Sequence, residues 1–174
     1  MRIEGKCHRL GDNVSTDDII SEKYKSRIMD LETLIPHLME NLDSEFAGSF
    51  RKGDFVVAGS NFGTGSSREI APVLIRAAGC VAVLAKSFAR IFYRNSFNIG
   101  LYLLECNTDD IAHGDHIMVN TEAGEINNYS QDKIIYFNAP TKLLSDILQK
   151  GGLIAYFKKY GRLSKAIQMN TKLP

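Results

Sequence analysis

A glycine-rich turn that follows an apolar run constrains this chain more than any other feature of its sequence. The apolar residues 54–60 predict a buried strand, and the motif Gly-Thr-Gly-Ser-Ser-Arg at residues 63–68 follows them. Apolar residues then recur at helical spacing over residues 70–78, so the motif joins a strand to the start of a helix. Backbone N–H groups at such a turn, with the guanidinium of Arg68 beside them, can hold a small anion. We expect this anion loop to use the backbone of Gly63, Thr64 and Gly65.

The motif differs from three commoner glycine-rich motifs. Arg68 stands where a dinucleotide-binding loop has its last glycine, and no Gly-Lys-Ser or Gly-Lys-Thr follows as in a Walker loop. Glu69 occupies the position at which a hydrolase elbow requires glycine. The sequence therefore does not indicate a dinucleotide site, a P-loop or a serine hydrolase.

Four segments of the chain resemble, in the same order, segments of the aconitase superfamily. Residues 63–69 are similar to the Gly-x-Gly-Ser-Ser-Arg-Glu signature of its swivelling domain, and residues 11–17, 85–92 and 151–153 match as well. The chain is thus similar to the small subunits of isopropylmalate dehydratase and to their homoaconitase-like relatives. The resemblance implies one swivelling β/β/α domain, of the aconitase C-terminal type, over residues 1–174.

Apolar periodicity also predicts an α/β domain. Residues 54–106 alternate strand, helix, strand, helix and strand, with Gly79 ending the first helix and Ser87 capping the second. Beyond Gly114, short strand-like segments separated by turn residues predict antiparallel strands, with a hairpin turn at residues 122–124. These strands are expected at residues 117–121, 125–129 and 133–138. Two helices and a loose tail are expected to follow at residues 143–148, 153–160 and 160–174.

Before the central unit, residues 31–42 carry the apolar stripe of a helix with Asp30 as its cap, interrupted by Pro36. Either the helix starts near this proline or two short turns abut there.

Composition and charge exclude two classes of partner. The net charge is +1, the hydrophobic fraction is 44%, and no apolar run approaches the length of a membrane span. The first four residues lack the apolar stretch of a signal peptide, so we expect a soluble, cytoplasmic protein with no membrane anchor. Basic residues gather near the C-terminus without an aromatic-studded basic face, so no nucleic-acid partner is expected. They are Lys158, Lys159, Arg162, Lys165 and Lys172.

The cysteines indicate that this chain holds no metal of its own. Cys7, Cys80 and Cys106 lie far apart, and none belongs to a Cys-x-x-Cys pair. Cys80 and Cys106 border apolar runs and are expected to be buried thiols. The resemblance places a [4Fe-4S] cluster on a large subunit, which would be the partner of this chain in a heterodimer or heterotetramer.

The resemblance also implies a reaction: a small hydroxy acid is dehydrated and rehydrated, so that its hydroxyl moves to the adjacent carbon. Ser66 aligns with the family's base, which acts as an alkoxide, and Asp17 aligns with an acidic residue of the active site. Arg68 can bind a substrate carboxylate through two parallel hydrogen bonds, and Ser67 can hydrogen-bond substrate. Helix-start N–H groups and Arg68 would supply the positive potential that the alkoxide needs.

Local sequence alone supports purely structural roles for the same residues. Ser66 and Glu69 fit a Ser-x-x-Glu capping box, in which Ser66 would cap the helix instead of reacting with substrate. Asp17 fits a turn or cap residue, and Asp18 is expected to be solvated. In the segment 85–92, we expect Arg90 to form a structural ion pair.

The polar stretch around Tyr24 lies, in the family, over the variable end of the substrate. Its residues Lys25, Ser26 and Arg27 are therefore expected to bind substrate. A cationic loop suits a charged end, as in homoaconitate, whereas isopropylmalate needs an apolar one. Isopropylmalate is the first choice because it is the most frequent substrate in the family. A function of another class, a module that binds phosphate or carboxylate without chemistry, stays open.

Overall fold

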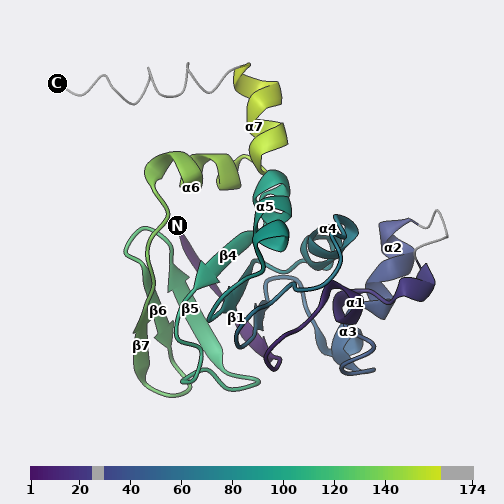
Figure 1. Cartoon of the computed structure of the whole chain (residues 1–174). Helices are drawn as coiled ribbons and strands as arrows, with labels where there is room; N and C mark the ends of the chain where they lie inside the picture. Colours follow the sequence, from purple (N-terminus) through teal and green to yellow (C-terminus); the bar gives the residue numbers. More distant parts are fainter. Residues whose placement is uncertain (25–29, 162–174) are drawn as a thin grey trace.

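The computed structural model describes residues 1–24 and 30–161, whose strands form one sheet flanked by helices (Figure 1). The sheet has the strand order β4-β3-β2-β1-β5-β6-β7. The first strands are β1 (Arg2–Arg9), β2 (Phe55–Val57), β3 (Ala82–Ala85) and β4 (Tyr102–Glu105). The remaining strands are β5 (His116–Asn120), β6 (Glu125–Asn128) and β7 (Lys133–Tyr136). The prediction of an α/β domain is confirmed.

Strand β1 joins a parallel half of the sheet to an antiparallel half. Its first residues pair antiparallel with β5, from Arg2 opposite Asn120 to Lys6 opposite His116. Its last residues, from Cys7 to Arg9, pair parallel with β2. The two ends of the sheet also meet, because Cys106 beyond β4 forms an isolated bridge with Phe137 beyond β7. The sheet is therefore curled, with β4 and β7 brought close at one point.

The predicted helices after β2 are present. They are α4 (Ile70–Ala77), α5 (Arg90–Ile99), α6 (Lys142–Gln149) and α7 (Leu153–Tyr160). Gly79 follows α4 at φ 93°, as expected of a residue that ends a helix. The predicted hairpin turn lies between β5 and β6, where Gly124 N–H donates to the Asn120 carbonyl.

Short helical segments precede β2. They are α1 (Thr16–Ile19), η1 (Glu22–Tyr24), α2 (Leu31–Leu34), η2 (Ile35–His37) and α3 (Phe46–Ser49). At Pro36 the second alternative holds, because the α-helical turn α2 passes directly into the 3₁₀ turn η2. Asp30 occupies the cap position of α2 but makes no capping hydrogen bond through its side chain. Among the described residues, no helix has the length and apolarity that a membrane crossing requires.

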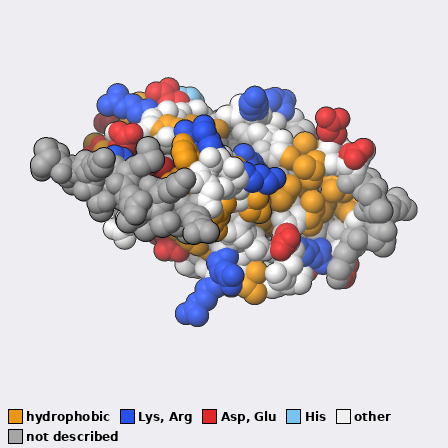
Figure 2. All heavy atoms as spheres, turned by 90° about the horizontal axis from the view of Figure 1, so that it is seen from above, with side chains coloured by type: hydrophobic (Ala, Val, Ile, Leu, Met, Phe, Trp, Pro, Cys, Tyr) orange, Lys and Arg blue, Asp and Glu red, His pale blue; other side chains and the backbone are white. Residues whose placement is uncertain are grey.

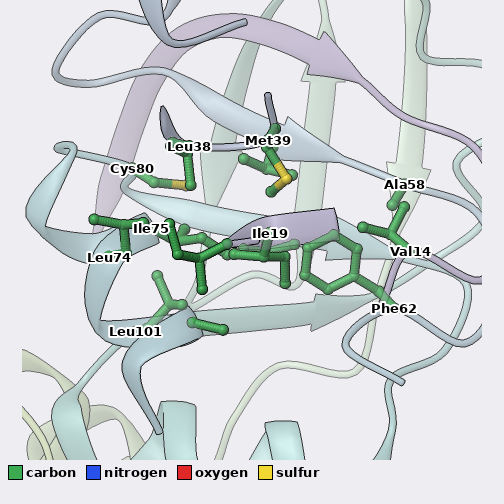
Figure 3. Close-up of a cluster of buried hydrophobic side chains, with 14 of the residues drawn as sticks. Val14, Ile19, Leu38, Met39, Ala58, Phe62, Leu74, Ile75, Cys80 and Leu101 are labelled. Atoms are coloured by element: carbon green, nitrogen blue, oxygen red, sulfur yellow. The ribbon is translucent and has the colours of Figure 1, made fainter. Parts of the chain in front are cut away.

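The core lies on both faces of the parallel strands, because successive side chains of a strand point to opposite sides. Val56 and Val83 join a cluster with α4, whereas Phe55 and Leu84 join a second cluster with the antiparallel strands. Figure 3 shows part of the first cluster, in which side chains of α4 pack near others from the segment before β2. Those it labels include Val14, Ile19, Leu38, Met39, Phe62, Leu74 and Ile75.

All three cysteines lie within these clusters, as was predicted for Cys80 and Cys106. Cys7, Cys80 and Cys106 are free and buried. Burial is the main cause that raises the pKa of each thiol to about 12. A raised pKa favours the protonated thiol, which is a poor nucleophile at neutral pH.

We predict that the thiols of the folded chain resist Ellman's reagent at about pH 8, because the thiolate is the reactive form. Denaturation in guanidinium chloride should restore ordinary thiol pKa values and allow all three cysteines to react. The measurement is the absorbance of the released thionitrobenzoate over time, with and without denaturant. Labelling of the folded chain within seconds would contradict the buried positions.

Candidate active site

The anion loop is held in place by the segment that follows β1. Gly63 N–H donates to the Val14 carbonyl at 2.7 Å, and Thr16 N–H donates to the Thr64 carbonyl at 2.8 Å. The Thr16 hydroxyl donates to the Ser66 carbonyl at 2.9 Å. Two segments about fifty residues apart in sequence are thus joined by hydrogen bonds at three successive points of the loop.

Gly63 has no Cβ because the loop approaches helix α5 too closely there. Its backbone has φ +79°, a left-handed conformation that L side chains rarely adopt. A Cβ at Gly63 would overlap the ring of Phe92 in α5. Phe92 is only 2% exposed and its ring lies 5.3 Å from that of Phe62, so it has little room to move. The glycine therefore allows the loop and α5 to form one packed unit.

Ser66 presents an exposed hydroxyl that does not cap helix α4. The helix begins at Ile70 with Glu69 in the cap position, and no side chain forms a capping hydrogen bond there. Instead, Arg68 Nε donates to Ser66 Oγ at 3.0 Å. The capping box that local sequence favoured is absent, so the Ser66 hydroxyl is not used by the helix start.

Arg68 links the loop to the N-terminal segment that carries Asp17. Its guanidinium forms an ion pair with the Asp17 carboxylate and donates to the Ile20 carbonyl at 2.9 Å. A second carboxylate, that of Glu22, lies 3.5 Å away. The Arg68 side chain is 9% exposed, whereas that of Asp17 is 48% exposed. The structure thus brings together Ser66, Arg68 and Asp17, three residues that the sequence assigned to one site.

The residue next to Asp17 has a different role from the one predicted. Asp18 is not simply solvated, because it completes a capping box with Ser15 at the start of α1. The Asp18 carboxylate accepts from Ser15 N–H at 2.8 Å, and the Ser15 hydroxyl accepts from Asp18 N–H at 3.1 Å. Since Ser15 and Asp18 cap α1, the Asp17 side chain is left to pair with Arg68.

A hollow of about 310 Å³ lies between the anion loop and the start of α5. The loop lines it from Gly63 to Arg68, which includes Ser66 and Ser67. The facing wall includes Arg90 and Asn95 of α5, which sequence reasoning did not assign to the site. For Arg90, the one signal in the sequence was that residues 85–92 match a family segment; that segment ends before Asn95. Arg90 forms no ion pair within the described residues, so the expected structural pairing is wrong and its charge faces the hollow.

Ser87 was also misassigned as a helix cap. Its hydroxyl accepts from Asn61 N–H at 2.8 Å, which fixes the turn before the anion loop. Helix α5 starts only at Arg90, with Ala89 in the cap position and no side-chain cap. The neighbouring Lys86 pairs with Asp109 at 2.6 Å. This segment therefore supports the loop through contacts that are distant in sequence.

The last three predicted site residues belong to the loop after Tyr24. Lys25, Ser26 and Arg27 lie outside the described residues. Within residues 1–24 and 30–161, no group of three or more His, Cys, Asp or Glu side chains could hold a metal ion.

Known proteins similar to this chain share its length as well as its sequence. The model of the family described as "Aconitase C-terminal domain" matches residues 8–109. The 3-isopropylmalate dehydratase small subunit 1 of Archaeoglobus fulgidus is 49% identical over 88% of this chain and 96% of its own length. The 3-isopropylmalate dehydratase small subunit of Wolinella succinogenes is 46% identical over 89% of this chain and 93% of its own.

A solved structure is similar over nearly the whole fold. The crystal structure of a 3-isopropylmalate dehydratase from Methanocaldococcus jannaschii superposes with a TM-score of 0.87 at 43% identity. The match covers 98% of this chain and 99% of the other.

We predict that Gly63→Ala destabilises the chain more than Gly161→Ala. Both glycines have similar left-handed φ values, +79° and +75°, and a residue with Cβ costs about 1–2 kcal/mol in that conformation. Only at Gly63 does the added Cβ also meet a buried ring, whereas at Gly161 no atom among the described residues lies within 4 Å. Chemical denaturation of both variants should give a larger loss for Gly63→Ala, and equal losses would contradict the close approach of loop and helix.

Proposed function

Because the chain belongs to the family of 3-isopropylmalate dehydratase small subunits, which carry the aconitase C-terminal domain, we propose that it is the small subunit of a heteromeric hydro-lyase that isomerises 3-isopropylmalate. The reaction would remove water from the hydroxy acid and add it back with the hydroxyl on the adjacent carbon. The observation that carries this proposal is the convergence of Ser66, Arg68 and Asp17 beside one hollow.

Ser66 is the proposed base. Its alkoxide would take the proton from the carbon beside a substrate carboxylate, leaving a serine hydroxyl and a negatively charged intermediate. A serine alkoxide needs a nearby positive charge at neutral pH. Arg68 Nε, which donates to Ser66 Oγ at 3.0 Å, supplies that charge directly. The exposed position of the hydroxyl leaves it open to a substrate in the hollow.

Arg68 and Ser67 are the proposed substrate-binding residues. The guanidinium is already engaged by Ser66 Oγ, the Ile20 carbonyl and the Asp17 carboxylate. A substrate carboxylate would bind two-pronged by taking the place of Asp17 on this fork. Asp17 then keeps the nearly buried arginine paired when substrate is absent, and returns to it when product leaves.

A second cation faces the same substrate. Arg90, on the opposite wall of the hollow, forms no ion pair within residues 1–24 and 30–161. A dicarboxylic substrate has two negative groups, so Arg68 and Arg90 together match its charge. Ser67 lines the hollow between them and would hydrogen-bond the substrate.

The proposed partner is a large subunit that carries a [4Fe-4S] cluster. The relatives are named as small subunits, which supports a heteromer with a larger chain. The described part of this chain does not fit such a cluster, because its cysteines are buried thiols with pKa values raised to about 12. We further propose that the enzyme acts in leucine biosynthesis, in keeping with the names of the relatives, and that it is cytoplasmic, as expected from the sequence.

Two other functions are alternatives that the experiments below distinguish from the proposed one. The cationic residues of the loop after Tyr24 favour a substrate with a charged end, as in a homoaconitase. The anion loop and Arg68 would also serve a module that binds phosphate without chemistry. That module needs neither an Asp17 partner for Arg68 nor a free Ser66 hydroxyl, so the observed cluster favours the enzyme.

We predict that this chain is inactive alone and that mixing it with its cluster-loaded large subunit gives isomerase activity. In that complex, Ser66→Ala should abolish turnover while substrate binding largely persists, because Arg68 and the loop N–H groups remain. Steady-state kinetics, substrate affinity and thermal melts of the complex provide the measurements. A folded Ser66→Ala complex with near-normal kcat would remove Ser66 from catalysis.

Arg68→Lys is the matched comparison for Ser66→Ala. Lysine keeps the positive charge but loses the planar fork, so substrate affinity should fall together with kcat. Phosphate binding by the isolated chain, without any activity in the complex, would instead favour the binding module.

We predict a change of substrate preference when the loop cations are removed. If Lys25 or Arg27 contacts a substrate carboxylate, replacing it with leucine should raise kcat/KM for apolar malate derivatives relative to charged ones by about tenfold or more. The physical reason is that an unpaired charge in a closed site is costly. Ratios that stay unchanged across a series of malate derivatives would show that these side chains do not contact the variable end.

A further inference from the structure

A second, larger hollow runs along the outer edge of β4. Its volume is about 750 Å³, and its walls come from β4, α5, α6 and the segment after β7. The segment after β7 meets the end of β4 at the bridge between Cys106 and Phe137. Beyond that bridge the hollow lies between β4 and residues 138–141, so the two segments part there and leave a groove.

The backbone of β4 faces this groove with unused hydrogen-bonding groups. Strand β4 is at the end of the sheet, and no strand of the described residues pairs with its outer edge before the bridge. Cys106 N–H donates inward to the Ala85 carbonyl. Because bonding direction alternates along a strand, the N–H and C=O groups of Leu103 and Glu105 point outward. Glu105 stands beside the bridge to the segment after β7, so among the described residues Leu103 is the unpaired residue of this edge. An unpaired strand edge of this kind accepts another extended segment.

The side chains around the edge are mainly apolar and partly exposed. Tyr93 of α5 is 43% exposed and Leu144 of α6 is 37% exposed. The Tyr102 hydroxyl is buried without a hydrogen bond of ordinary geometry, although the Gln149 side chain lies near it. Apolar surface beside a free strand edge is the usual composition of a docking groove, and the tyrosine hydroxyl offers it one further donor.

Positive charge lies on the α5 side of the groove. Arg90 and Arg94 line it, and Glu105 is the only acidic residue among the described residues that do so. Arg90 also lines the hollow of the candidate active site, so the two hollows are adjacent along α5. Figure 2 shows apolar side chains gathered across the face seen from above, with Lys and Arg side chains beside them.

We infer that this groove binds an extended segment of the large subunit, which adds as a strand to the outer edge of β4. The segment carries apolar side chains toward Tyr93 and Leu144 and a carboxylate toward Arg94. This inference rests on the proposed heteromer and specifies where the partner binds. The adjacency at Arg90 selects the large subunit as the occupant, because that partner must close the active-site hollow to exclude water.

The first test compares two matched glutamate substitutions. Leu144→Glu places a charge in the groove. Ile154→Glu places the same charge in the first turn of α7, where the side chain is 56% exposed and outside the groove. Affinity for the large subunit, measured by calorimetry, should fall about tenfold or more for Leu144→Glu and stay unchanged for Ile154→Glu. Arg94→Gln should weaken binding and reduce its sensitivity to salt.

The second test reads the backbone directly. Hydrogen exchange at Leu103 should slow when the large subunit binds, whereas the outer strand β7 should be unaffected. Wild-type affinity for both Leu144→Glu and Arg94→Gln, or unchanged exchange in β4, would overturn the groove while leaving the proposed function intact. Absence of any complex with the wild-type chain would overturn both. Thermal melts of each variant verify that it is folded.

Discussion

Strand β1 is the element on which both halves of this structure depend. Its first five residues pair with the antiparallel strands and its last three with the parallel strands, so the sheet is continuous only through it. A buried polar contact stands where the strand changes partner: His8 Nε2 lies 2.8 Å from the Asp54 carboxylate, which also accepts from Arg51 N–H at 2.9 Å. Asp54 directly precedes β2, so this polar contact fixes how β1 and β2 enter the sheet.

The same strand delivers the residues that build the candidate active site. The chain leaves β1 and runs beside the anion loop, where Val14 and Thr16 hydrogen-bond to it. This alignment places the Asp17 carboxylate against Arg68 and so holds the Arg68 side chain in position. Arg68 in turn donates a hydrogen bond to the Ser66 hydroxyl. A nearly buried guanidinium would be costly without a carboxylate, so the ion pair is a condition for keeping Arg68 at the loop. The geometry around Ser66, the proposed base, thus originates in a pairing of backbone segments far from it in sequence.

Local patterns in the sequence predicted the parts of the fold that local forces determine. The apolar stripe of α4 and the strands β2 to β7 were predicted because their apolar patterns are strong. Strand β1 was not predicted, because its inward positions include Gly5 and Cys7, which are weak strand signals. Ser87 was assigned wrongly because a tertiary hydrogen bond from Asn61, which spacing along the chain does not encode, decided its role. Asp18 was assigned wrongly for a different reason: its capping box with Ser15 is a local contact between residues three apart, which the sequence carried and the prediction overlooked.

Helix α5 is the wall shared by the two hollows, and its packing makes them mechanically dependent. Phe92 fills the space that Gly63 leaves empty, so α5 cannot shift without moving the anion loop. Arg90, two residues earlier on the same helix, borders both the active-site hollow and the groove beside β4. A segment bound in that groove would therefore contact the helix that supports Ser66 and Arg68 from behind. Under the proposed docking, binding of the large subunit and alignment of the site would therefore be one packing event instead of two.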